Sequence, residues 1–144
     1  MFSQPVRSIM ERRKFVTVPP TTTVREASQM MAKKQVGAVL VVENERLLGI
    51  FSERDVVFRV VARGLDPATT PLEKVMTPEP KTIKPNNTFG YAMTLMHENR
   101  FRHLPVIDQG KVVGIVSARS ALDPELEEFV CEERRRQHFK EEAT

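Results

Sequence analysis

The segment Gly49–Asp55 (GIFSERD) combines residue types that can bind an anion. The hydroxyl group of Ser52 and the free N–H groups of a helix beginning at Glu53 would face a negative charge, which the helix dipole favours. Gly49 would let the backbone approach this turn. The alternative is that Ser52 and Asp55 only cap the helix and need no ligand. From the residues alone, capping is the simpler interpretation.

Basic side chains at other positions could complete an anion site. Arg102 offers a planar fork for phosphate oxygens, and His103 can donate from either ring nitrogen. The alternative is that they are two surface residues at the start of a strand. Arg54 and Arg119 each fall in the first turn of an expected helix, where an arginine more often points to solvent than to phosphate.

The sequence lacks the usual motifs of catalysis and metal binding. CxxC, HxxxH, GxSxG, P-loop and GxGxxG patterns are all absent. Cys131 is followed by two glutamates, whose charge disfavours a thiolate. We therefore predict no catalytic residue, no metal ligand and no catalytic cofactor; the three histidines are isolated, at His97, His103 and His138.

The elements that position these residues occur twice. Residues 17–55 align with 82–120 at a constant offset of 65, and ten of the 39 positions are identical. An upstream Pro-x-x-x-[Ile/Val]-Met also recurs after a slip of one residue. The pattern predicts two repeats, at 5–64 and 71–123, followed by a charged helical tail at 124–144.

Each repeat is expected to fold as β-α-β-β-α. In repeat one, Thr23 and Glu26 form a capping box ahead of a helix. Two β-branched runs around a polar turn then predict a hairpin, and Ser52 begins a second helix that Gly64 ends. Because so small a sheet leaves one apolar face uncovered, we expect an α+β protein whose repeats pack with pseudo-two-fold symmetry.

Charge is distributed unevenly. The tail, residues 124–144, carries a net charge of −3 and the remainder +6, which favours a small anionic partner on the body. The tail has a narrow apolar stripe suited to a partner subunit, and we expect Asp123 to end the preceding helix before Pro124. Nucleic-acid binding through Arg134–Arg136 is unlikely because glutamates surround these arginines.

The sequence also suggests a compartment. The longest apolar stretches, Gly37–Val42 and Leu47–Phe51, are too short to cross a bilayer. The N-terminus lacks the apolar core of a secretory signal. A single cysteine excludes an intramolecular disulfide bond and fits a reducing environment. We predict a cytoplasmic protein without a membrane partner.

These motifs together resemble the cystathionine-β-synthase (CBS) domain. The resemblance rests on the duplicated Gly-Ile-x-Ser-x-Arg ending and on Arg102–Asp108 (RHLPVID), and it covers residues 5–123. The tandem resembles a stand-alone bacterial Bateman module. It implies a non-enzymatic, homodimeric sensor of cellular energy or metabolites. Such a module binds AMP, ADP, ATP, S-adenosylmethionine or NAD-type ligands between its repeats and acts on an unknown protein in trans.

The resemblance also implies roles for individual residues. Asp55 would accept both ribose hydroxyls, while Arg102 and His103 would contact phosphate from the opposite repeat. The position matching Asp55 in repeat two is Ser120, a weaker acceptor, so we predict one good site per chain. The ligand-binding candidates are Thr17, Val18, Gly37, Ala38, Ser52, Arg54, Asp55, Thr82, Arg102, His103, Pro105, Ser117 and Arg119.

Two other functions stay open. The chain could be a structural or dimerisation module with vestigial clefts, in which Thr17 and Thr82 are ordinary strand residues. It could also bind nucleic acid weakly through its basic body. Within the nucleotide hypothesis, Arg102 and His103 favour a phosphorylated ligand over S-adenosylmethionine, which would bring a cation to a positive cleft.

Overall fold

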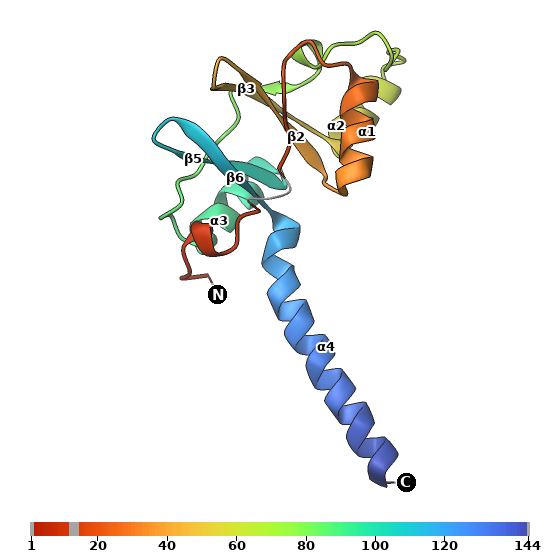
Figure 1. Ribbon diagram of the computed structural model, residues 1–144, viewed down its shortest axis with the longest axis vertical. Helices are drawn as coiled ribbons and strands as arrows, with labels where there is room; N and C mark the ends of the chain where they lie inside the picture. Colours follow the sequence, from red (N-terminus) through yellow and green to blue (C-terminus); the bar gives the residue numbers. More distant parts are fainter. Residues whose placement is uncertain (1, 12–14, 144) are drawn as a thin grey trace.

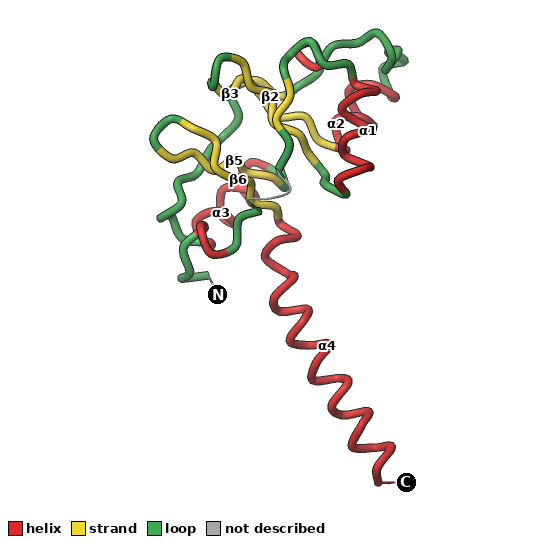
Figure 2. The backbone as a smooth tube through the Cα atoms, viewed as in Figure 1, coloured by secondary structure: helices red, strands yellow, loops and turns green. Residues whose placement is uncertain are grey.

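The protein consists of a two-lobed body and one long projecting helix (Figure 1). The structure, a computed structural model, describes residues 2–11 and 15–143, and the side chains of 120–128 and 142–143 lie outside this description. Each lobe pairs a small sheet with helices, so the predicted α+β class is confirmed (Figure 2).

The first lobe is built as a β-α-β unit followed by a hairpin. Strand β1 (Thr17–Val18) lies parallel to β2 (Ala38–Glu43), which pairs antiparallel with β3 (Arg46–Ser52). Helix α1 (Val24–Lys34) connects β1 to β2 and buries one apolar face against them. Thr23 caps its beginning as predicted, because the Glu26 N–H donates to Thr23 Oγ1 at 3.1 Å. The Glu26 carboxylate accepts from the Thr23 hydroxyl at 3.1 Å rather than from its backbone N–H, so the box is only half formed.

The second lobe repeats this arrangement. Helix α3 (Phe89–Asn99) precedes the hairpin of β5 (His103–Asp108) and β6 (Lys111–Ser117). A single parallel bridge between Ile83 and Val106 takes the place of β1. Both hairpins have two-residue turns with positive φ at both positions, the geometry that matches the twist of the strands; these turns are Asn44–Glu45 and Gln109–Gly110.

The two lobes exchange their leading segments. Strand β4 (Thr77–Pro78) pairs with β3, and the preceding η3 turn (Leu72–Lys74) buries Leu72 in the core of the first lobe. Conversely, η1 (Val6–Ser8) packs Val6 into the core of the second lobe. The segment that begins each sequence repeat therefore completes the lobe formed by the other repeat.

This exchange gives Gly49 a role that differs from the expected one. A Cβ atom at Gly49 would lie 2.8 Å from the Thr77 carbonyl oxygen and 2.5 Å from Met76 Sδ. At Gly114, a Cβ atom would lie 3.0 Å from the Glu11 carbonyl oxygen. Both glycines thus leave room for the exchanged segment rather than for a sharp turn.

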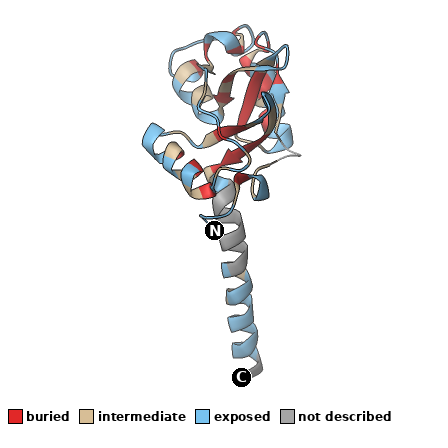
Figure 3. Cartoon of the chain, turned by 90° about the vertical axis from the view of Figure 1, so that its left-hand side faces the viewer, coloured by how far each residue is buried: buried red, intermediate tan, exposed pale blue. Residues whose placement is uncertain are grey.

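A third apolar cluster joins the lobes. Ala38 and Leu40 of β2 and Ile115 of β6 are buried together, with Ile50 and Val112 packed around them. The two sheets therefore face each other, and the buried residues concentrate in the strands (Figure 3). The contact relates β2–β3 to β5–β6 as the predicted pseudo-two-fold packing requires.

The helices that follow the two hairpins differ in length. In the first lobe, α2 (Glu53–Asp55) continues directly into η2 (Val56–Val61), which has π-helical hydrogen bonding, and Gly64 follows with a φ of +69°. In the second lobe, α4 (Ala118–Ala143) projects from the body (Figure 1).

The expectation that a helix ends at Asp123 is wrong, because α4 continues through Pro124. A proline inside a helix removes one backbone hydrogen bond, a loss that a helix of 26 residues can tolerate.

Candidate functional site

Two cavities lie between the lobes, one on each side of the contact between the sheets. Cleft one has a volume of about 940 Å³ and takes its lining from three segments. These are Ile50 with 52–55 and 57–59, Thr77 with 79–81, and 99–103. Cleft two, about 1040 Å³, is lined by the pseudo-symmetric parts, chiefly 115–119, Phe15 with Glu11, and 35–38. Each cleft therefore takes one wall from each repeat.

The motif of repeat one forms a complete capping box at the edge of cleft one. The Ser52 N–H donates to Asp55 Oδ2 at 2.9 Å, and the Ser52 hydroxyl donates to the same oxygen at 3.1 Å. The Asp55 N–H donates in turn to Ser52 Oγ at 3.3 Å. Capping is therefore present, and because a carboxylate has about four acceptor positions, Asp55 keeps capacity for a ligand.

Arg59 holds the other oxygen of this carboxylate. Its Nε lies 3.5 Å from Asp55 Oδ1, and the Asp55 side chain is only 16% exposed. The Arg59 Nη1 also donates to the carbonyl oxygens of Val75 at 3.3 Å and Met76 at 3.1 Å. One guanidinium group thus joins the motif of repeat one to the segment that leads into β4.

The opposite wall of cleft one carries Arg102 and His103, at the start of β5. His103 packs against the backbone of Gly37, where a Cβ atom would lie 3.0 Å from its Nε2. Burial lowers the pKa of His103 below its ordinary value of 6.5; Glu53 and Asp55 oppose this shift and Arg102 adds to it. The imidazole is therefore neutral at pH 7, and a phosphate nearby would favour its protonated form.

Cleft one has a positive balance of charge. Five arginine or lysine side chains line it, against three carboxylates. The guanidinium of Arg54 lies 5.0 Å from the ring centroid of Phe58 at the mouth. Since opposite charges attract in a partly enclosed cavity, this lining favours an anionic ligand.

Cleft two lacks the Asp55–Arg59 pair. Its helix N-terminus presents Ser117 and Arg119, and its wall from repeat one includes Gly37 and Ala38. Glu53, Arg102 and His103 line it as well as cleft one. Two acidic and two basic side chains line it, so its charges balance. The side chain of Ser120, at the position matching Asp55, lies outside the described residues.

The sequence model of the CBS domain family matches residues 6–62 and 72–124. The chain belongs to this family. The matched ranges overlap the two sequence repeats, which were predicted at 5–64 and 71–123, so the clefts lie between two CBS domains that exchange their leading segments.

Relatives and solved structures support the same assignment. The CBS pair is 40% identical to the CBS domain-containing protein YhcV of Bacillus subtilis over 101 residues, which cover 70% of this chain and 71% of the relative. It spans 20% of the length of the Arabidopsis thaliana protein CBSCBSPB1, which it also matches.

Two solved structures are informative. A CBS domain protein of Burkholderia ambifaria, named as a signal-transduction protein, has a TM-score of 0.79 and 33% identity, covering 84% of this chain and 93% of that one. A CBS domain protein of Pyrobaculum aerophilum complexed with AMP has a TM-score of 0.74 and 28% identity, covering 81% and 89%.

Most of the predicted site residues line the two clefts. Ser52, Arg54 and Asp55 line cleft one. Cleft two is lined by Gly37, Ala38, Ser117 and Arg119. Arg102 and His103 line both, because β5 begins at the boundary between the two cavities.

Four predicted site residues do not reach either cleft. Val18 points into the core of the first lobe, which leaves its strand neighbour Thr17 on the exposed face. Thr82 lines a separate cavity near Arg7, and Pro105 is buried within β5 opposite Ile115. Successive side chains of a strand point to opposite faces, so Thr17 is exposed where Val18 is buried.

The sequence analysis missed several residues of cleft one. Glu79, Pro80 and Lys81 line it because β4 pairs with the first lobe and carries the following residues to the cavity. Phe58 and Arg59 lie on η2, one turn beyond the motif. The four-residue spacing of Asp55 and Arg59 on an expected helix was a usable signal for their ion pair.

The described part of the chain shows no cluster of three or more metal-binding side chains. Nor does any helix among the described residues have the length and apolarity needed to cross a membrane.

Proposed function

We propose that this CBS pair is a non-enzymatic regulatory module that binds an adenosine-containing nucleotide, of the AMP, ADP, ATP or NAD type, in cleft one. One observation carries the proposal. Cleft one combines the Ser52–Asp55 motif of one repeat with Arg102 and His103 of the other in a single cavity with an excess of positive charge. Its volume of about 940 Å³ is ample for a mononucleotide.

The lining chemistry fits the parts of a nucleotide. Asp55 can accept a hydrogen bond from one ribose hydroxyl at Oδ1, and from the other at Oδ2 where that hydroxyl replaces the Ser52 hydroxyl as donor. Arg102 can bind phosphate oxygens as a planar fork, and His103 can donate to them once protonated. The aromatic rings of Phe58 and Phe101 offer apolar surface for a base. The AMP complex of the Pyrobaculum aerophilum relative supports this class of ligand.

Ligand binding would act on the arrangement of the lobes. A nucleotide held by both walls cross-links the two repeats, so it stabilises one relative position of the lobes over others. We propose that a partner protein reads this change in trans and that the module works in the cytoplasm as a sensor of energy or metabolite state. The single cysteine, Cys131, is exposed and fits a reducing compartment.

We also propose that the module is a homodimer. The π-helical segment η2 exposes three apolar side chains: Val57 is 54% exposed, Phe58 59% and Val61 67%. Exposed apolar side chains gathered on one helix are typical of a subunit contact. A CBS-CP12 protein of cyanobacteria that is similar to this chain is hexameric, which supports the proposal of self-assembly.

The same exposed surface favours a second candidate function. A dimerisation module with unused clefts would need η2 but would gain nothing from the charges of cleft one. Ligand binding separates this candidate from the sensor.

A thermal-shift panel with AMP, ADP, ATP, NAD, NADH, S-adenosylmethionine and GTP tests the proposal. A ligand at about a hundred times its Kd adds about 2.7 kcal/mol to the free energy of unfolding, which raises Tm by several degrees. We expect a shift with at least one adenosine phosphate and none with GTP. Folded protein, free of co-purified nucleotide, that responds to no ligand would favour the dimerisation module. Binding that ignores the nucleobase and falls steeply with salt would indicate nucleic-acid binding instead.

A further inference from the structure

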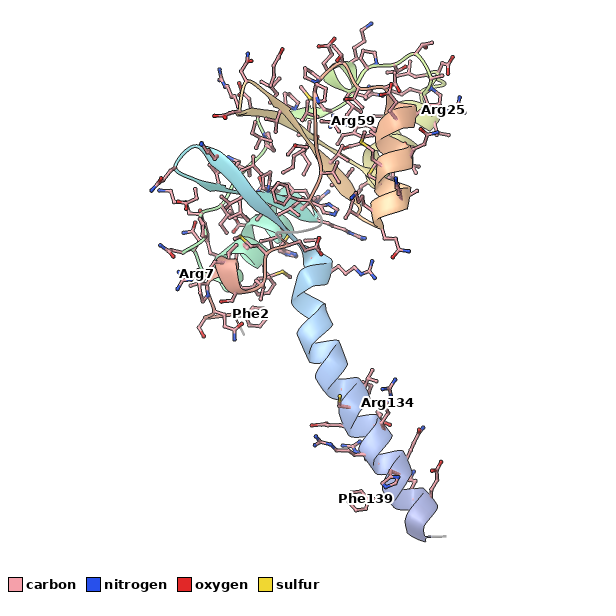
Figure 4. The ribbon with its side chains drawn as sticks, in the orientation of Figure 1. Phe2, Arg7, Arg25, Arg59, Arg134 and Phe139 are labelled. Carbon is pink, nitrogen blue, oxygen red and sulfur yellow. The ribbon has the colours of Figure 1, made fainter. Side chains whose placement is uncertain are left out.

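Arg59 occupies an unusual position beside cleft one. It lies on η2 and reaches inward among the side chains of the first lobe, whereas Arg25 points outward from α1 (Figure 4). Its guanidinium contacts three acceptors on two separate segments: Asp55 Oδ1 and the carbonyl oxygens of Val75 and Met76. The Arg59 side chain is 36% exposed, so these contacts are partly shielded from water.

Both oxygens of the Asp55 carboxylate are thereby held. Oδ2 accepts from the N–H and the hydroxyl of Ser52, and Oδ1 faces Arg59. The capping box alone would leave Oδ1 without a fixed neighbour. With Arg59 in place, Oδ1 presents its remaining acceptor position in a defined direction. One hydroxyl of a vicinal pair can donate there while the other replaces the Ser52 hydroxyl at Oδ2.

Arg59 also anchors the neighbouring wall. The carbonyl groups of Val75 and Met76 immediately precede Thr77, which pairs with β3 and lines cleft one. The guanidinium therefore ties the position of this wall to the position of the carboxylate.

Repeat two has no equivalent of this arrangement. At the offset of 65, the counterparts of Asp55 and Arg59 are Ser120 and Pro124, which can supply neither a carboxylate nor a cation. The pair is therefore a property of cleft one.

We propose that Arg59 is a positioning residue that sets the preference of cleft one for a ligand with an intact vicinal diol. This inference rests on the proposed nucleotide-binding function. Arg59 acts through Asp55: it fixes the direction in which the carboxylate presents its free lone pairs and the distance from the carboxylate to the wall at Thr77.

The positioning role can be separated from a simple effect of charge. Loss of any cation near the cleft weakens every phosphorylated ligand to a similar extent. Loss of the orientation of Asp55 weakens only those ligands that carry the diol. The ratio of affinities for AMP and 2′,3′-dideoxy-AMP therefore reports on positioning and cancels the Coulombic contribution.

The experiment measures both affinities by calorimetry for the full chain and for Arg59→Met, Arg59→Lys and Arg63→Met. Arg63 is an exposed arginine four residues further along and serves as the matched control for loss of charge. We expect Arg59→Met to lose about tenfold in affinity for AMP and about twofold for dideoxy-AMP, as for loss of one charge-assisted contact. The ratio of the affinities for AMP and dideoxy-AMP should also be lower in Arg59→Lys than in the unaltered protein, since an ammonium group cannot hold all three acceptors. In Arg63→Met this ratio should equal that of the unaltered protein.

Each outcome bears on the proposal. Parallel losses for the two ligands, or full recovery of the ratio in Arg59→Lys, would overturn the positioning role while leaving nucleotide binding intact. If another adenosine nucleotide gives the larger thermal shift, it takes the place of AMP and is paired with its own 2′,3′-dideoxy analogue. If the unaltered protein binds no adenosine nucleotide, the proposed function fails, and the inference fails with it. Melting temperatures without ligand verify folding, and if Arg59→Met does not fold, the ratio in Arg59→Lys decides.

Discussion

Cleft one and cleft two share a backbone and differ in chemistry. In cleft one the Glu53 N–H donates to the Gly37 carbonyl oxygen at 2.9 Å, and in cleft two the Ala118 N–H donates to the Arg102 carbonyl oxygen at the same distance. The side chains do not follow this symmetry. Asp55 and Arg59 line cleft one, whereas cleft two has Ser117 and Arg119 with Gly37 and Ala38 and shares only Glu53, Arg102 and His103 with cleft one.

The difference shows which positions the fold constrains. A duplicated unit must keep the glycines that admit the exchanged segments, the two-residue hairpin turns, and the threonines that cap α1 and α3. Most residues that face a ligand are outside these requirements, and Asp55 is an exception because it also caps α2. One cleft can therefore hold a charged site while the other lacks it, at a cost in stability of about 1 kcal/mol for the cap.

Replacement of the acidic residue gives the largest expected contrast between the clefts. Asp55→Ala should reduce the affinity for AMP by about a hundredfold, because it removes hydrogen bonds to a charged group. It should also lower the free energy of unfolding by about 1 kcal/mol through loss of the cap. Ser120→Ala, at the corresponding position, should change AMP affinity by less than about twofold. Calorimetric titration of the folded variants measures both, and equal losses would show that the clefts bind alike.

The two glycines test the packing side of the comparison. A methyl group at Gly49 would meet the Thr77 carbonyl oxygen at 2.8 Å, closer than the 3.0 Å to the Glu11 carbonyl oxygen at Gly114. Gly49→Ala should therefore lower the free energy of unfolding by about 2 kcal/mol and Gly114→Ala by about 1 kcal/mol, as expected for overpacking. Denaturant unfolding measures both values. The reverse order would mean that the second lobe holds its exchanged segment more tightly.

The smallest expected effect is a dependence of binding on pH. Burial lowers the pKa of His103 in the free protein, and a bound phosphate raises it again, so binding takes up a proton. Affinity for AMP should rise by about threefold as pH falls through the interval between the pKa of His103 in the complex and its lower pKa in the free protein. The corresponding residue of repeat one, Ala38, cannot contribute such a change.

His103→Asn is the control for this effect. The phosphate group of AMP also titrates near about pH 6, but it does so equally with both proteins. The difference between the two pH profiles therefore isolates the imidazole. Without ligand, the free energy of unfolding should fall as pH drops below 6.5. The reason is that His103 has a lower pKa in the folded chain than in the unfolded chain, so the unfolded chain binds the proton at a higher pH. If AMP affinity depended on pH in the same way for His103→Asn and for the unaltered protein, His103 would not be the group that takes up the proton.

Local signals in the sequence predicted most of the fold. The threonine caps, the polar turns between β-branched runs and the repeat offset correctly indicated the elements and their order. The exchange of leading segments was not predictable in this way. Both segments carry the same Pro-x-x-x-[Ile/Val]-Met pattern, and an apolar residue such as Leu72 or Val6 fits either core equally well.

Only part of the candidate site was predictable, because local sequence patterns reveal motif residues but not residues that the exchanged segment brings to the cavity. Asp55, Arg102 and His103 belong to recognisable motifs, and the structure brings them to one cavity. Lys81 and Glu79 reach that cavity through the exchanged segment, a non-local event with no local pattern. Thr17 and Val18 were assigned to the cleft without knowledge of which strand face turns inward.

The exchanged segments also determine the order in which the chain can fold during synthesis. The first lobe lacks Leu72 and Val75 until the segment that follows repeat one has left the ribosome. Val6, which is made before either repeat is complete, finds its neighbours Phe89 and Leu104 only after most of repeat two has emerged. Such pairing of distant residues slows folding. The two lobes are thus interlocked by their own connectivity, and neither CBS repeat, cut from the chain at its sequence boundary, would carry a complete core.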